Sequence, residues 1–300
     1  MSNENKNNKY MKKNRFSVAG GLMCLAALVL LSACGKVDYK MLKRGEGKMT
    51  PEMGDYIIGE MWITVGDSIL MTNAGKPTPI IQVGEPEFKG DLQEGIRLLH
   101  EGDSARFNIK ADSIRARGMQ LPEIVKETLS YVIKVQQIIP ESEFPAYLEA
   151  KMAEADLDQQ QAIAAYLQEN GLNVQPTSDG LYFIRTKEGR GKTIKQGSPV
   201  KFHYVGRLLD GTIFDTSIKE VAEENGLLHP MRNYEPLSTM AGTGQMIMGM
   251  DEGLLMMRQG DKATLIIPFQ LGYGDRDLGP IPAYSTLVFE MEIVSVEDPA

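Results

Sequence analysis

Cysteine and histidine are scarce in this chain of 300 residues. The two cysteines, Cys24 and Cys34, both lie near the N-terminus, so no disulfide can cross-link the rest of the chain. The three histidines, His100, His203 and His229, do not have the spacing of metal ligands. We therefore expect neither a disulfide-stabilised fold nor a metal site, and no pattern in the sequence indicates a cofactor.

An excess of basic residues is also missing. The chain has 32 Lys and Arg against 40 Asp and Glu, a formal net charge of −8 at pH 7. Nucleic-acid binding depends on a basic surface, so nucleic acid is not an expected partner. A hydrophobic content of 42% with 24% charged residues is ordinary for a globular protein. The length predicts two domains.

The N-terminus has the layout of a secretory signal. Basic residues between positions 12 and 15 precede an apolar run over residues 17–31. The run ends in Leu31-Ser-Ala-Cys34, which resembles the lipobox of bacterial lipoproteins. A plain transmembrane anchor is the alternative, but the run is short for a bilayer span. We expect residues 1–33 to be a lipoprotein signal peptide, with translation starting at Met1 or Met11.

Acylation of Cys34 would attach the mature protein to a membrane. The expected location is the bacterial cell envelope, at the outer membrane and facing the periplasm. The membrane is then a partner through the lipid on Cys34, in addition to any polypeptide that the protein binds.

The first half of the chain echoes the second half at a long period. The offset between matched residues is 144 at Gly45, 143 at Gly54 and Asp67, and 158 later in the two copies, so the second copy has a net insertion of 15 residues after Asp210. This insertion follows Ser217 and is helical in composition. The matched pairs are Gly45 and Gly189, Gly54 and Gly197, Asp67 and Asp210, Glu94 and Glu252, Gly95 and Gly253, Gly102 and Gly260, and Thr128 and Thr286. A period this long indicates a duplicated domain rather than a solenoid.

A helical segment separates the two copies. Tyr147, Leu148 and Met152 share one helical face, and the same spacing returns after residue 158. Asn170-Gly171 is a plausible helix end. Residues 141–175 are therefore predicted to form one or two helices, whose apolar stripe packs on a neighbouring domain or, alternatively, forms a dimer.

Residues 260–293 predict two strands joined by a shaped loop. Residues 263–267 and 286–293 are rich in branched and aromatic side chains, which is typical of strands. The loop between them carries Tyr273 and Tyr284 among several glycines and prolines. Because glycine permits sharp turns and proline fixes φ, the loop should have a defined shape. Side chains on such loops are often functional.

A series of short segments in the last third of the chain resembles the FKBP-type peptidyl-prolyl isomerases. No single segment identifies the family, but the ordered set is a specific match. The segments are Val200–Gly206, Asp210–Ser217, Gly242–Gly253, Gly260–Lys262, Ile267–Pro268, Leu271–Gly274, Ile281–Pro282 and Thr286–Phe289. The resemblance implies an α+β fold in which an antiparallel sheet wraps around a short helix, here expected at residues 250–258.

The resemblance also implies a prolyl isomerase with an apolar pocket. Isomerisation changes no covalent bond, so it needs no nucleophile, and we find no Ser-His-Asp or Cys-His arrangement. Taken without the resemblance, the aromatic residues would be read as ordinary core. The matches to the family's catalytic positions are Asp215, Tyr273 and Phe214, and those to its substrate-binding wall are Tyr204, Leu237, Met246, Ile247, Met250, Ile281 and Phe289.

Three wall positions depart from the family pattern. Met250 stands where most members have Trp, Leu237 replaces Phe, and Met246 replaces Val or a similar residue. Methionine is flexible and repacks easily. We therefore expect real but sub-maximal isomerase activity.

The first copy keeps little of the site. By offset, Met61, Met71, Thr72 and Arg115 stand at the positions of Tyr204, Phe214, Asp215 and Tyr273, while Tyr131 stands at that of Phe289. The first copy therefore lacks the hydroxyl donor, the acid and most of the ring wall. We expect it to be FKBP-like in fold and not an isomerase.

The sequence thus predicts four parts. They are a signal peptide over residues 1–33, a degenerate FKBP-like domain over 34–140, a helical linker over 141–175 and an FKBP-type isomerase domain over 176–300. The expected partners are proline-containing unfolded or nascent polypeptides of the envelope. Two alternatives are a non-enzymatic chaperone or partner-binding lipoprotein that uses FKBP-like clefts, and a structural subunit of an envelope complex.

Overall fold

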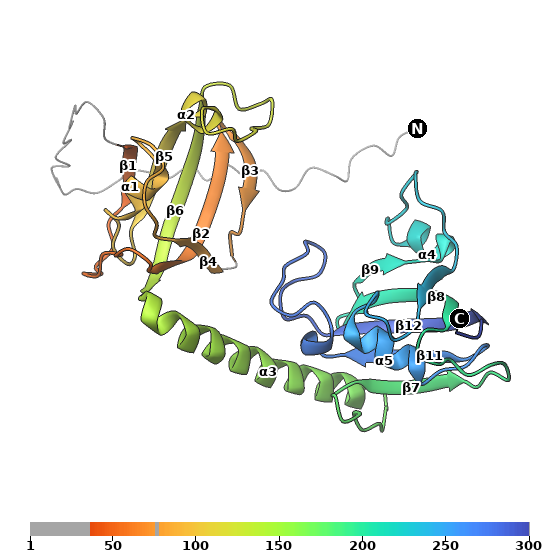
Figure 1. Ribbon diagram of the computed structural model, residues 1–300. Coiled ribbons are helices and arrows are strands. Elements are labelled where there is room, and N and C mark those ends of the chain that lie inside the picture. Colours follow the sequence, from red (N-terminus) through yellow and green to blue (C-terminus); the bar gives the residue numbers. More distant parts are fainter. Residues whose placement is uncertain (1–36, 76–77, 300) are drawn as a thin grey trace, which may run out of the picture. The chain divides into compact units, whose positions relative to one another are not determined.

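The structure, a computed structural model, describes residues 37–75 and 78–299. The chain divides into two compact units, with the boundary between Pro140 and Glu141 (Figure 1). The predicted signal peptide over residues 1–33 and the predicted acylation site at Cys34 lie outside the described residues. Within the described ranges, no helix is both long and apolar enough to cross a membrane.

The first unit is an antiparallel sheet with two short helices. Its strands lie in the order β1-β5-β6-β2-β3, and β4 also pairs with β2. The core lies between the sheet and α1, around Phe107 and Ile133. The elements are β1 (Asp38–Lys43), β2 (Tyr56–Val65), β3 (Ser68–Thr72), β4 (Thr78–Gln82), α1 (Leu92–Ile96), β5 (Ser104–Lys110), α2 (Ala111–Arg115) and β6 (Thr128–Ile139).

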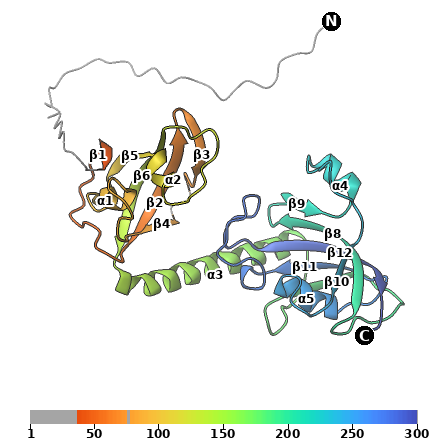
Figure 2. The ribbon, with the colours of Figure 1, turned by 45° about the horizontal axis from the view of Figure 1, so that its top comes forward.

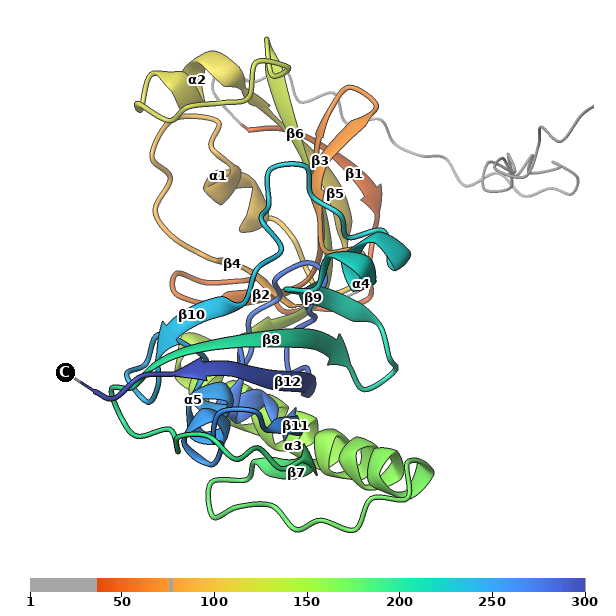
Figure 3. The ribbon, with the colours of Figure 1, turned by 90° about the vertical axis from the view of Figure 1, so that its right-hand side faces the viewer.

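The second unit repeats this plan after a long helix. Its strands lie in the order β10-β8-β12-β11-β7, which Figure 3 shows, and β9 also pairs with β8. The elements are η1 (Glu141–Glu143), α3 (Phe144–Glu169), β7 (Tyr182–Lys187), β8 (Pro199–Leu208), β9 (Ile213–Thr216), α4 (Lys219–Glu224), β10 (Leu237–Met240), α5 (Met248–Leu255), β11 (Lys262–Ile267), η2 (Phe269–Leu271) and β12 (Leu287–Val296).

The two sheets have the same topology. In chain order, β1 corresponds to β7, β2 to β8, β5 to β11 and β6 to β12, and the strand that follows β2 or β8 pairs with it in both units. The prediction of an α+β protein with two domains, each an antiparallel sheet around a short helix, is confirmed. That short helix begins two residues earlier than expected in the second unit, at Met248.

The repeated Gly-Asp pattern has one structural reason in both units. Asp103 and Asp261 are fully buried, and each accepts a hydrogen bond from a distant glycine amide. The bond from Gly45 N to Asp103 Oδ1 measures 2.8 Å, and that from Gly189 N to Asp261 Oδ1 measures 2.6 Å. A buried carboxylate is tolerated only when it is hydrogen-bonded or paired. These residues therefore fix the same turn in each sheet.

The short helix of each unit lies against its sheet at a glycine. A Cβ added at Gly95 in α1 would lie 2.3 Å from Phe107 Cε1, and one added at Gly253 in α5 would lie 2.4 Å from Leu265 Cδ1. Phe107 and Leu265 occupy the corresponding strands β5 and β11. The conserved spacing between copies thus reflects one way of packing helix on sheet.

Helix α3 packs on the opposite face of the second sheet. Ile163 is buried against Ile266 and Val288. Because successive strand residues point to opposite faces, Ile266 faces α3 while Leu265 faces α5. Figure 2 shows the ribbons of α3 and α5 beside this sheet. The sequence left one or two helices open over residues 141–175, and the structure has one α-helix after a single 3₁₀ turn. A linker role for that segment stays a prediction.

Candidate functional site

The structure brings the ten predicted site residues together on the α5 side of the second sheet. Nine belong to a single hydrophobic cluster, and the tenth, Asp215, is hydrogen-bonded to one of them. Tyr204, Met250, Ile281 and Phe289 are buried, and the partly buried members are Phe214, Leu237, Met246, Ile247 and Tyr273. Their functional roles stay predictions, but they share one location.

Three aromatic rings form the centre of this cluster. The centroid of the Phe289 ring lies 6.0 Å from that of Tyr204 and 5.7 Å from that of Phe214, with Phe214 edge-on. Gly206 makes this possible, since it lies opposite Phe289 in the sheet. A Cβ on Gly206 would lie 2.7 Å from Phe214 Cε2 and 2.8 Å from Phe289 Cε1.

Asp215 connects the rings to a cation at the rim. The Tyr204 hydroxyl donates to Asp215 Oδ2 at 2.5 Å, and the Arg232 guanidinium forms an ion pair with Asp215 Oδ1. Arg232 also donates to the Tyr204 hydroxyl at 3.0 Å. The three groups are mutually bonded, so the orientations of the phenol and the carboxylate are fixed.

Two phenols of the site are held neutral. Burial, together with the hydrogen bond to Asp215, raises the pKa of Tyr204 to about 12. Burial and the negative charge of Asp215 also raise the pKa of Tyr273. Tyr273 therefore lies within the field of Asp215. Both hydroxyls remain protonated hydrogen-bond donors at neutral pH.

Arg232 is a site residue that the sequence reasoning missed. It lies between α4 and β10, at the end of the 15-residue insertion that follows Ser217. One signal could have indicated it: Arg232 is the only arginine between Arg207 and Arg258. No short-range pattern joins it to Asp215, because the contact depends on the path of the inserted segment.

The loop between β11 and β12, which begins with η2, carries Tyr273 and Ile281 to the cluster and has the predicted defined shape. Leu278 N donates to Ile281 O at 2.9 Å, and Tyr284 N donates to Gly274 O at 2.8 Å. Tyr284 has a positive φ of 59°, which is uncommon for a residue with a side chain.

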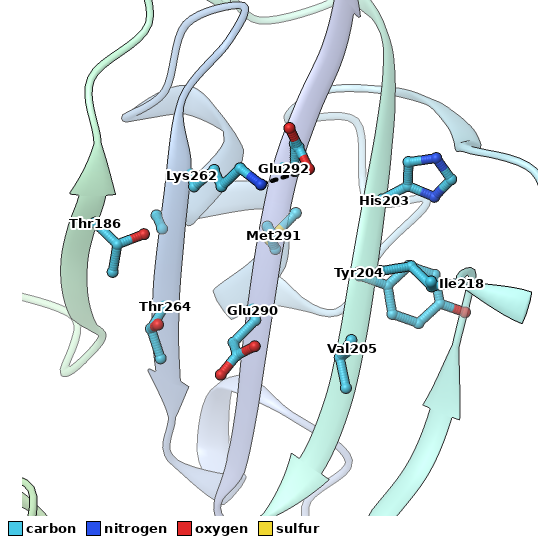
Figure 4. Close-up of a pocket in the computed structure, with 11 residues that line it drawn as sticks. Thr186, His203, Tyr204, Val205, Ile218, Lys262, Thr264, Glu290, Met291 and Glu292 are labelled. Carbon is cyan, nitrogen blue, oxygen red and sulfur yellow. Dashed lines mark ion pairs between the residues drawn. The ribbon is translucent and has the colours of Figure 1, made fainter. Parts of the chain in front are cut away.

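A separate groove lies on the opposite face of the same sheet (Figure 4). It has a volume of about 330 Å³ and a partly charged lining that includes the ion pair between Lys262 Nζ and Glu292 Oε2 at 2.9 Å. His203 Nδ1 lies 3.0 Å from Ser217 Oγ beside it. Tyr204 borders this groove from β8, but the other predicted site residues do not line it.

The corresponding place in the first unit lacks the site. Tyr131 lies opposite Ile63 in the sheet, as Phe289 lies opposite Gly206. The position of Gly206 is thus occupied by a branched side chain. Met61 and Tyr131 pack against the core of this unit.

The strand pairing corrects two sequence assignments. Met71 lies opposite Ile63, as Asp215 lies opposite Gly206, so Met71 and not Thr72 corresponds to Asp215. Leu70 consequently takes the position of Phe214. The assignment was wrong by one residue because the turn between β8 and β9 is one residue longer. The first unit still has neither an acid nor a ring at these positions.

Comparison with known proteins agrees with this geometry. The sequence model of the FKBP-type peptidyl-prolyl cis-trans isomerases matches residues 191–294, all within the second unit. The FK506-binding protein 1A of Aspergillus fumigatus is 43% identical over 105 residues, which are 35% of this chain and 82% of that protein. This chain belongs to the FKBP-type peptidyl-prolyl isomerase family.

Other FKBP relatives match the same part of the chain. The FK506-binding protein 2 of Debaryomyces hansenii is 43% identical over 34% of this chain and 66% of its own length. The human peptidyl-prolyl cis-trans isomerase FKBP2 is 41% identical over 34% of this chain and 64% of its own length. The chain thus spans just under two thirds of each of these two relatives.

One solved structure similar to this FKBP-type chain is the crystal structure of FkpA from Escherichia coli. It is 30% identical, with a TM-score of 0.40, and the match covers 53% of this chain and 67% of that one.

Proposed function

We propose that the second unit catalyses cis-trans isomerisation of the peptide bond that precedes proline in polypeptide substrates. The observation that carries the proposal is the cluster in which the Tyr204, Phe214 and Phe289 rings adjoin the bonded Tyr204, Asp215 and Arg232 groups. The matches to FKBP-type isomerases support the same function.

The chemistry requires only that the twisted amide be favoured over the planar one. Amide resonance gives the planar bond its barrier and its polarity, and water stabilises that polar form. Aromatic and aliphatic surroundings exclude water and thereby narrow the energy difference to the twisted form. The rings of Phe214 and Phe289, with Met246 and Ile247 partly exposed beside them, provide such surroundings. No covalent intermediate is involved.

The polar groups at the rim have a positioning role in this proposal. Tyr273 is neutral, so its hydroxyl can donate a hydrogen bond to a substrate carbonyl. Asp215 is fixed by Tyr204 and Arg232 and can polarise the edge of the ring cluster. Because Met250 and Leu237 replace larger aromatic residues of the family, we propose sub-maximal activity and weak binding of FK506.

A protease-coupled assay with a proline peptide tests this function on the purified chain. The uncatalysed step takes tens to hundreds of seconds, so a modest acceleration is measurable. Phe214→Ala should lower kcat/KM at least about tenfold because it removes one ring contact. Val294→Ala, at an exposed strand position, is the matched control and should have no effect. A wild-type chain without any acceleration would contradict the proposal.

We further propose that the substrates are unfolded or nascent polypeptides of the bacterial envelope, and that a lipid on Cys34 holds the protein there. The sequence Leu31-Ser-Ala-Cys34 supports this. A single acyl chain binds membranes only marginally, so stable attachment requires more than one chain. Radiolabelled palmitate should enter the wild type and not Cys34→Ala. Equal labelling of both would refute the anchor.

One observation favours a chaperone as the second candidate function. The edge strand β3 of the first unit is exposed along its whole length, and Ile69, Leu70 and Met71 are among its side chains. An exposed apolar edge strand can pair with another extended chain. Suppression of aggregation of an unfolded client that lacks proline, without any isomerase activity, would favour this candidate over the enzyme.

A further inference from the structure

A glutamine of α3 holds both ends of the loop that carries Tyr273 and Ile281. Gln159 is only 7% exposed, although it lies on a helix whose surface is otherwise mostly polar. Its Oε1 accepts a hydrogen bond from Phe269 N at 2.6 Å, at the start of the loop. The same oxygen accepts one from Thr286 Oγ1 at 3.1 Å, at the end of the loop.

The amide nitrogen of Gln159 extends the contact. Its Nε2 donates to Gln270 Oε1 at 2.9 Å, and Gln270 Nε2 donates in turn to Asp156 Oδ1 at 2.6 Å. Gln159 and Asp156 are three residues apart and therefore neighbours on α3. The loop is thus joined to α3 by a closed network in which the polar atoms of the buried Gln159 side chain have partners.

The first unit closes its corresponding loop from within, through residues of the short helix α2 at the start of that loop. Ala111 occupies the position of Phe269, and its amide donates to Glu127 O at 2.9 Å, across the base of its own loop. Arg115 then ties the same loop through the carbonyl oxygens of Val125 and Lys126. In the second unit the equivalent amide, that of Phe269, donates its hydrogen bond to Gln159 Oε1 instead. The second loop therefore depends on α3 for a bond that the first loop makes internally.

The contact at the base of the loop continues to the site through backbone bonds. Gly274 N donates to Phe269 O at 2.9 Å, which closes the chain around Tyr273. Tyr284 N then donates to Gly274 O at 2.8 Å, and the rings of Phe269 and Tyr284 meet edge to face at 5.3 Å. Tyr273 thus lies in a short segment that the bond between Gly274 and Phe269 closes, so its backbone position depends on Phe269.

The start of α3 also lies near this loop. Burial raises the pKa of Tyr284. Asp275 of the loop and Tyr147 of α3 raise this pKa further, and Lys151 of α3 lowers it. Two successive turns of α3 therefore lie within electrostatic range of Tyr284, in addition to the contacts of Gln159. α3 thus lies near the loop at Tyr284 and holds its base at Phe269.

We propose that Gln159 is a positioning residue for prolyl isomerisation: from α3 it fixes the loop over residues 268–286 and so sets Tyr273 and Ile281 against the ring cluster. The catalytic part of this inference rests on the proposed function. The structural part does not, because it concerns the order of the loop itself.

The test uses the full chain with Gln159→Met, which keeps the length of the side chain and removes its hydrogen bonds. Gln161→Met, on the exposed face of the same helix, is the matched control. Amide hydrogen exchange is followed in residues 268–286 and in β8, together with kcat and KM for a proline peptide. Thr286→Val, which removes one of the two bonds to Oε1, is a second variant whose effect should be smaller.

In Gln159→Met we expect exchange in the loop to rise about tenfold while exchange in β8 stays unchanged, since a net hydrogen bond corresponds to roughly that factor. The value of kcat should fall about tenfold, with a smaller change in KM and no change in Gln161→Met. Loop exchange equal to that of the control would overturn the proposal, and so would faster exchange with unchanged kcat. A wild type that turns over no proline peptide would contradict the proposed function, while the exchange result would still decide whether Gln159 positions the loop.

Discussion

The two units have the same sheet topology, and each has its own hydrophobic core of the same plan. They differ at the backbone position of Gly206, which contacts two aromatic rings in the second unit. In the second unit Gly206 leaves space for Phe214 and Phe289. In the first unit Ile63 lies at the equivalent point, opposite Tyr131. The comparison shows that the fold requires the buried Asp and the helix glycines, which both copies retain, and does not require the ring cluster.

The polar half of the site differs for another reason. Asp215 is paired with Arg232, which follows the inserted helix α4. The first unit has Met71 in place of Asp215 and no corresponding insertion between β3 and β4. The insertion thus supplies the partner that fixes the carboxylate in the second unit.

The largest expected effect comes from giving the second unit the first unit's residue, with Gly206→Ile. The added side chain would collide with Phe214 and Phe289, so the rings must move. We expect kcat/KM to fall about 100-fold or more, and the free energy of unfolding to fall by about 1–3 kcal/mol from overpacking. The coupled peptide assay and urea unfolding measure these two quantities.

Val205→Ile is the control for this substitution. It adds a methylene group on the same strand but on the opposite face of the sheet, at the groove shown in Figure 4. It should leave kcat/KM nearly unchanged. If Gly206→Ile retained wild-type activity, the glycine would not be what separates the two units.

A smaller effect is expected from Asp215→Ala. This change removes the acceptor of the Tyr204 hydroxyl and leaves the Arg232 cation unpaired. We expect kcat/KM to fall about tenfold. The stability should change by less than about 1 kcal/mol, because the side chains of Asp215 and Arg232 are 39% and 38% exposed and water screens their attraction. Lys219→Ala, at an exposed position of α4, is a control, and an equal loss of activity in that variant would contradict the assignment.

Tyr273→Phe should have a weaker effect still. The ring remains against the cluster and only the hydroxyl donor is lost, so we expect kcat to fall about three- to tenfold with little change in KM. Steady-state kinetics with a proline peptide provide the measurement. Tyr284→Phe removes a hydroxyl from the same loop and should leave kcat and KM nearly unchanged. Equal losses in both variants would indicate a general effect on the loop.

The smallest expected effect is that of pH. Burial raises the pKa of Tyr204 to about 12 in the folded protein, above the usual value of about 10. Its neutral form therefore stabilises the folded state fully below about pH 10, and this contribution is lost as the pH rises through about 12. The value of kcat/KM should be flat from about pH 7 to about pH 10. A decline in that range that disappears in Tyr204→Phe would contradict the assignment.

Most of the fold could be predicted from the sequence because the two copies repeat their turn residues. The Gly-Asp pairs at residues 102–103 and 260–261 mark the same buried hydrogen bonds, and the strand pattern around residues 263–267 matched β11. The hairpin that carries Phe214 was correct in the second copy. In the first copy the assignment of the second strand of this hairpin was wrong by one residue. The offset between matched glycines does not give the length of the turn between the two strands.

The site could be predicted from the sequence only through its resemblance to a known family. Tyr204, Phe214 and Phe289 would otherwise have been assigned to the core, and the structure shows that they are part of the core as well. Gln159 gave no signal in the sequence, and Arg232 gave only its isolation between Arg207 and Arg258, because each acts through a contact with a residue that is distant in sequence. Long-range polar contacts of this kind have no periodicity.

The central claim is that one unit catalyses and the other only retains the fold, and it is tested most directly by separating them. Residues 37–140 and residues 141–300 are produced as two polypeptides, divided at the chain boundary between the two compact units. Each is first checked for cooperative unfolding and then assayed for isomerisation of a proline peptide. The account predicts that residues 141–300 carry all the activity of the full chain and that residues 37–140 fold without any. Measurable turnover by residues 37–140, or none by folded residues 141–300, would contradict it.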